Sequence, residues 1–131
     1  MIAKPRYGHI VQTHLSFDEA VARAKELLKA EGFGVLCEID VRKTLKEKIG
    51  AEFRPYLILG ACNPALAHHA LSTEGQLGLL LPCNLVVQHE DAGVTVSAID
   101  AAVLLDVVGR AELSATANDV NARFARILSR F

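Results

Sequence analysis

The stretch that decides the fold reads RPYLILGACNP, residues 54–64. Its continuous apolar run predicts a strand that is buried on both faces or central in its sheet. Asn63 and Pro64 then fit the opening of a helix, with the amide as N-cap and proline at the first helical position, where its missing N–H costs nothing. The stretch therefore predicts a strand over 55–61 that leads directly into a helix over 65–71.

A hairpin is the clearest pattern downstream of this stretch. Residues 84–90 and 93–99 are rich in valine and are separated by a short segment that ends in glycine, which is typical of two antiparallel strands. Between the helix and the hairpin, residues 76–81 fit either a helix or an extended segment, and Pro82 ends the run in both cases.

The N-terminal part is predicted to contain a strand over 8–15 and then a helix. Ser16 and Glu19 have the spacing of a capping box, in which a hydroxyl and a carboxylate each pair with a backbone N–H at the helix start. Apolar residues recur at intervals of three and four over 17–28, so one face of this helix should pack against the core. Gly32 is a common kind of helix stop.

The remaining elements follow from the same signals. Residues 34–40 have an extended pattern, and Asp40 is positioned to cap a short surface helix over 41–49. Residues 101–109 suit a short helix and a buried extended segment equally well. The apolar stripe between residues 113 and 131 has helical period, so the chain is expected to end on a packed helix.

These elements predict an α+β fold. We expect a single two-layer domain over residues 1–131, with a mixed or antiparallel sheet of about five strands and helices packed on it. The expected order is β-α-β-α-β-α-β-β-α. A length of 131 residues is suitable for one such core.

The composition excludes several classes of function. Hydrophobic residues make up 51% of the chain and the formal charge is −1, which indicates a folded protein without the positive field that nucleic acid requires. No apolar run approaches the roughly 20 residues that span a bilayer, and the first residues lack a secretory pattern, so we expect no membrane partner and a cytoplasmic location. The three cysteines, an odd number, are expected to be reduced thiols.

The order of the motifs resembles a known family. Residues 59–64 (LGACNP), residues 81–83 (LPC) and the valine-rich hairpin follow one another as in the bacterial and archaeal family called domain of unknown function 302. The predicted helix over 17–28 and the segment 44–48 are also similar, so the resemblance covers nearly the whole chain. It implies a compact fold of strand–helix units, a sheet covered by helices and a homodimer, and it implies little about activity.

The candidate site is built on two thiols. Cys62 and Cys83 each stand where an apolar run ends, beside Asn63, and Gly60 would let a ligand approach the backbone. We therefore expect Gly60, Cys62, Asn63 and Cys83 to surround a pocket at the end of the third strand. The alternative is that both cysteines are small buried hydrophobes, and Cys37, inside a strand pattern, is expected in the core.

Two further groups are weaker candidates for binding. His68 or His69 could join the two thiols in a metal site with two sulfurs and one nitrogen, although adjacent helical residues diverge by about 100° and cannot both face it. The histidines on strands, His9, His14 and His89, are expected at the surface or an interface. The basic residues within 42–48 are expected to form a solvated helix face.

Three hypotheses of function remain open. The first is a small ligand- or metal-binding or accessory domain, whose cofactor the sequence does not identify. The second is a thiol-based redox protein or enzyme in which Cys62 is the thiolate and Cys83 its resolving partner. The third is a purely structural homodimer whose valine-rich hairpin pairs edge to edge with a second copy.

Overall fold

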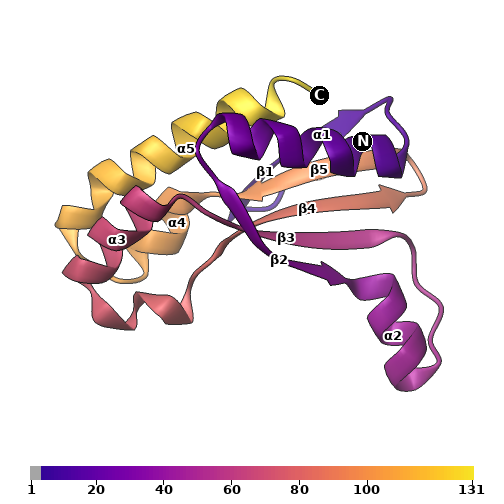
Figure 1. Cartoon of the computed structure of the whole chain (residues 1–131), viewed down its shortest axis with the longest axis horizontal. Coiled ribbons are helices and arrows are strands. Elements are labelled where there is room, and N and C mark those ends of the chain that lie inside the picture. Colours follow the sequence, from indigo (N-terminus) through magenta and orange to yellow (C-terminus); the bar gives the residue numbers. More distant parts are fainter. Residues whose placement is uncertain (1–3) are drawn as a thin grey trace.

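A computed structural model of the chain describes residues 4–131 and contains one antiparallel five-stranded sheet (Figure 1). The strand order is β1-β5-β4-β3-β2, and every neighbouring pair is antiparallel. This confirms the predicted α+β class and about five strands. The strands are β1 (Gly8–Thr13), β2 (Gly34–Asp40), β3 (Tyr56–Cys62), β4 (Cys83–Glu90) and β5 (Gly93–Ile99).

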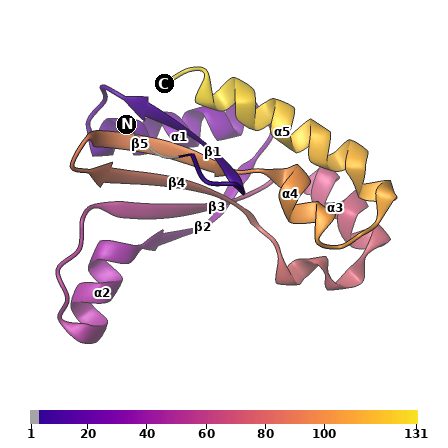
Figure 2. The same cartoon turned by 180° about the vertical axis from the view of Figure 1, so that it is seen from behind.

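Helices cover one face of this sheet. The long helices α1 and α5 lie side by side on it, and α3, η1 and α4 gather beyond one end of the strands (Figures 1 and 2). The helices are α1 (Phe17–Ala30), α2 (Val41–Ile49), α3 (Pro64–Thr73), α4 (Ala101–Asp106) and α5 (Ser114–Leu128), with short 3-10 turns η1 (Gly75–Leu79) and η2 (Ala111–Leu113). None of the helices in residues 4–131 has the length and apolar character needed to cross a membrane.

Local signals set the helix ends as the sequence predicts. The Ser16 hydroxyl accepts a hydrogen bond from the Glu19 N–H, and the Glu19 carboxylate accepts one from the Ser16 N–H, which completes the capping box of α1. Gly32 follows α1 with a φ of 84°, which other residues rarely adopt. Asp40 caps α2 by accepting from the N–H of Lys43.

The core lies between the sheet and the helix pair. Leu59, Leu85 and Val96 of the three inner strands are fully buried against Leu28 of α1 and Phe124 of α5. Phe33, just after α1, stacks on Phe124 with ring centroids 5.0 Å apart. Within residues 4–131, no helix covers the opposite face of the sheet (Figures 1 and 2).

The structure corrects three expectations. β3 is an inner strand but not the central one, and it is buried on both faces only over residues 59–61, because Tyr56 and Ile58 face the uncovered side and are half-buried. Cys37 is exposed rather than in the core, since β2 is an edge strand. The β4–β5 hairpin has β1 and β3 on its two sides, so it cannot pair edge to edge with a second copy.

Two segments that the sequence leaves undecided take helical form. Residues 75–79 form η1, and residues 101–106 form α4. Asp100 caps α4 by accepting from the N–H groups of Ala102 and Val103. The helix α4 is an addition to the predicted element order.

Candidate functional site

The end of β3 is shaped by a helix cap. The Asn63 side-chain oxygen accepts a hydrogen bond from the Leu66 N–H at 3.3 Å, and Pro64 occupies the first turn of α3, as the sequence predicts. The cap turns the chain sharply out of the sheet. The turn leaves Cys62 half-buried at the strand end, beside the space beneath α3.

A cavity of about 240 Å³ occupies that space, and we call it the Cys62 cavity. It lies between the ends of β3 and β4 on one side and the helices α3, α4 and α5 on the other. Its wall is almost wholly apolar. It is lined by Phe33, Leu36, Ala61, Cys62, Asn63, Leu66, Ala67, Ala70, Leu71, Leu77, Gly78, Leu81, Pro82, Cys83, Ala101, Leu104, Leu105, Thr116 and Val120.

Three of the four predicted ligand-binding residues line this cavity: Cys62, Asn63 and Cys83. Cys83 is brought there because its strand neighbour Ala61 precedes Cys62. Burial, with a smaller contribution from the nearby Cys62 thiol, raises the pKa of Cys83 to about 11. Cys83 is therefore a neutral thiol at physiological pH and serves as part of an apolar wall.

Gly60 and the two histidines do not contribute to the cavity. A side chain at Gly60 would meet the Cys37 sulfur at 2.5 Å and the Pro82 ring at 2.9 Å, so this glycine allows close packing within the protein instead of ligand approach. His68 and His69 are exposed on α3. Residues 4–131 contain no group of three His, Cys, Asp or Glu side chains placed to hold a metal ion, so the two-sulfur, one-nitrogen site is not assembled.

Sequence reasoning missed the helical side of the cavity. Leu104 and Leu105 of α4, and Thr116 and Val120 of α5, form that side. The helical period of α5 marks Val120 as a core residue, but no local signal shows that α4 and α5 face the end of β3. Their position follows from the strand order, which places β5, and hence α4, near the middle of the sheet.

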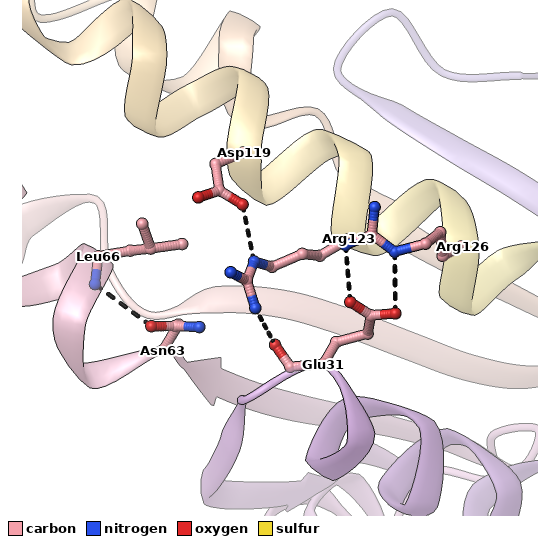
Figure 3. A network of polar contacts seen from close by, with 6 residues as sticks. All are labelled: Glu31, Asn63, Leu66, Asp119, Arg123 and Arg126. Atoms are coloured by element: carbon pink, nitrogen blue, oxygen red, sulfur yellow. Dashed lines mark hydrogen bonds and ion pairs between the residues drawn. The ribbon is translucent and has the colours of Figure 1, made fainter.

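A polar network ties the helices together close to the cavity (Figure 3). The Arg123 guanidinium on α5 donates to the Glu31 carbonyl oxygen at 2.6 Å and to Asp119 at 2.7 Å. Arg126 makes two hydrogen bonds to the Glu31 carboxylate, and these bonds hold the pKa of Glu31 below its usual value. The network fixes the end of α1 against α5, beside the Asn63 cap.

Comparison with known proteins agrees with this architecture. The family model described as "Domain of unknown function DUF302" matches residues 9–131. The chain belongs to the DUF302 family. A crystal structure of an uncharacterized conserved DUF302 protein from Bacillus stearothermophilus is 33% identical, covers 96% of this chain and 98% of that chain, and superimposes with a TM-score of 0.89. Among curated proteins there is no match to this DUF302 chain.

Proposed function

We propose that this DUF302 protein binds a small, predominantly apolar molecule in the Cys62 cavity. The observation that supports the proposal is a cavity of about 240 Å³ whose lining is aliphatic apart from two thiols, Asn63, Thr116 and Phe33. Apolar cavities of roughly 150 Å³ stay dry and take up benzene, so a cavity of this size suits a monocyclic or short-chain ligand. Its place beyond the strand ends, among helices, is a common one for ligand sites.

In this proposal the two thiols are the polarisable part of the cavity wall. Cys62 is the more accessible of the two and would contact the ligand, while the neutral Cys83 thiol lies behind it. A redox role for the pair is less well supported, because Cys83 is buried and its pKa is raised. The three free cysteines agree with a reducing, cytoplasmic environment for the binding protein.

A cavity-filling substitution tests the proposal. Ala67→Leu adds three carbon atoms to the wall, whereas Ala65→Leu makes the same change on the exposed side of the same helix. We expect benzene to raise the melting temperature of the wild type and of Ala65→Leu in a saturable manner, and to leave that of Ala67→Leu unchanged. An equal response of all three proteins would overturn the proposal.

The natural ligand is sought by native mass spectrometry of protein purified without added metal or reductant. We expect a retained small molecule on the wild type, lost in Cys62→Ser with the melting temperature nearly unchanged. The opposite result has two parts: the wild type carries no small molecule and does not respond to benzene, and the Cys62→Ser variant has a much lower melting temperature than the wild type. That result would make both cysteines structural.

A further inference from the structure

The lining of the Cys62 cavity has a buried part and an exposed part. Ala61 of β3, Leu77 of η1 and Val120 of α5 belong to the lining and are buried. Leu36 of β2 and Leu71 of α3 belong to the same lining, yet they are 68% and 40% exposed. Lining residues with this much exposure stand where a cavity meets solvent. The two leucines therefore mark the mouth of the cavity.

An irregularity in β2 accompanies the position of Leu36 at this mouth. The register of the β2–β3 pair shifts between Val35 and Cys37, as at a β-bulge, which leaves Leu36 outside the ladder. Bulges re-aim a side chain and are common beside functional sites. Leu79, which follows the lining residue Gly78 in η1, is a further exposed leucine. The apolar wall thus continues from the cavity onto the protein surface, where contiguous apolar side chains often mark a binding groove.

The interior of the cavity offers no partner for a charge. Among residues 4–131, no Asp, Glu, Lys, Arg or His side chain belongs to the lining. The Asn63 side-chain oxygen already accepts the hydrogen bond from the Leu66 N–H, and the Cys83 thiol is neutral because burial raises its pKa to about 11. Burying an unpaired charge in such surroundings is strongly unfavourable. A charged or well-hydrated group of a ligand therefore has to stay outside, at the mouth.

We propose that the molecule bound in the Cys62 cavity is a single-chain amphiphile, an assignment that rests on the proposed function. Its alkyl tail fills the cavity, and its polar head group stays in water at the mouth. The first carbon atoms after the head group lie against Leu36 and Leu71, which removes apolar surface of both leucines from water. A ligand confined to the interior would leave these leucines exposed.

The volume of the cavity sets the length of the tail. An apolar cavity of roughly 150 Å³ holds the six carbon atoms of benzene, so a volume of about 240 Å³ holds in proportion about eight to ten carbon atoms. Each methylene group that leaves water inside the cavity should tighten binding roughly fourfold. Carbon atoms beyond that number reach the mouth, where the leucines cover them only in part, so the gain for each further methylene should be smaller.

Isothermal titration calorimetry with a series of straight-chain alcohols tests the assignment. We expect the affinity of the wild type to rise roughly fourfold for each methylene group from 1-butanol to 1-octanol, and less steeply from 1-octanol to 1-decanol. Octanoate and octylammonium should bind about as well as 1-octanol, because the head group remains in water. Binding of 1-octanol without binding of either charged analogue would show that the head group is buried, and would overturn the proposal.

Two variants at the mouth test the contact with the chain. Leu36→Gln and Leu71→Gln each replace an exposed leucine of the lining by a polar side chain of similar length, and each should weaken binding of 1-decanol roughly fourfold, the equivalent of about one methylene group. Both should leave the response to benzene unchanged. The control is Ile49→Gln, at a position that is 72% exposed on α2 and outside the lining, and it should bind 1-decanol like the wild type.

The outcomes separate this assignment from the proposed function. If benzene and 1-butanol bind but 1-octanol binds no more tightly than 1-butanol, the assignment to an amphiphile is overturned and the proposed function stands. If neither benzene nor any alcohol binds, both are overturned. Equal affinities of the wild type, Leu36→Gln and Leu71→Gln for 1-decanol would also overturn the assignment, and the presence of two variants keeps this comparison available if one of them does not fold.

Discussion

Gly60 occupies the most crowded position of β3, since Cys37 of β2 and Pro82 before β4 both approach it. A methyl group at this position would lie 2.9 Å from the rigid Pro82 ring and 2.5 Å from the Cys37 sulfur. We expect Gly60→Ala to lower the free energy of unfolding by about 1–3 kcal/mol through overpacking, measured by urea denaturation.

Two controls accompany the Gly60 variant. Gly34→Ala adds the same methyl group in β2, where its nearest neighbour, the Cys62 carbonyl oxygen, is at 3.9 Å, and should leave stability nearly unchanged. The double variant Cys37→Ala/Gly60→Ala should recover part of the free energy of unfolding that Gly60→Ala loses, because the smaller side chain at position 37 makes room for the added methyl group. Equal effects of the two glycine substitutions would show that the crowding is not the cause.

The three thiols should differ in reactivity because their surroundings differ. With its pKa raised to about 11, Cys83 holds roughly 200-fold less thiolate at pH 8 than a free thiol of pKa ~8.5, and it is buried. We expect iodoacetamide to modify exposed Cys37 readily and Cys83 at least roughly 100-fold more slowly, as followed by peptide mass spectrometry. Rapid modification of Cys83 in the folded protein would contradict this assignment and favour a redox pair.

At the scale of elements, Asp100 controls the start of α4. Burial tends to raise the pKa of this carboxyl, but hydrogen bonds from Asn121, Val103 and Ala102, with His9 nearby, outweigh burial and lower it. A lowered pKa in the folded state stabilises the fold above the ordinary value of about 3.9, and this stabilisation is lost as the pH falls through the folded value.

Acid titration of stability checks this role. We expect the melting temperature of the wild type to fall as the pH is lowered below about 4, and Asp100→Asn to show a weaker dependence there. Asp106→Asn, at an exposed position of the same helix, should keep the wild-type slope. Identical slopes for Asp100→Asn and the wild type would place the acid sensitivity elsewhere.

Elements marked by local chemistry are the ones that the sequence predicts well. The capping residues Ser16, Asp40 and Asn63 bond to backbone groups within three residues, so their signals need no knowledge of the rest of the chain. The segments that form η1 and α4 are short and mostly apolar, and apolar periodicity alone does not separate a short helix from a buried strand.

At the scale of the whole molecule, Arg123 joins α5 to the end of α1. Its bond to the Glu31 carbonyl oxygen links residues that lie 92 positions apart in the chain, while Asp119, one turn earlier on α5, accepts a second bond from the same guanidinium (Figure 3). We expect Arg123→Met to lower the free energy of unfolding by about 1–3 kcal/mol, because a half-buried carbonyl group loses a charged donor. Arg42→Met, on exposed α2, should change it little, and a comparable loss in both variants would count against this role.

The limits of sequence-based prediction also appear at this scale. The meeting of Cys62 and Cys83 in one cavity was predicted from their places at the ends of two apolar runs, and in the structure it follows because Cys62 ends β3 and Cys83 begins the neighbouring strand β4. The strand order was not predictable from the sequence, since it depends on contacts between residues that are far apart in the chain. That order made Cys37 an edge residue, enclosed the hairpin between two other strands, and brought Thr116 and Val120 to the cavity.

The strand order also bears on synthesis. The first two described strands, β1 and β2, lie at opposite edges of the sheet, and in the part of the chain that the structure describes β1 pairs with β5 alone, whose last residue is Ile99. A nascent chain leaving the ribosome therefore carries an unpaired β1 until about three quarters of its length has emerged. The sheet is completed late, when the β4–β5 hairpin takes its place between β1 and β3, and until then the apolar residues of β1, β2 and β3 lack their partners in the core, a state that is prone to aggregation.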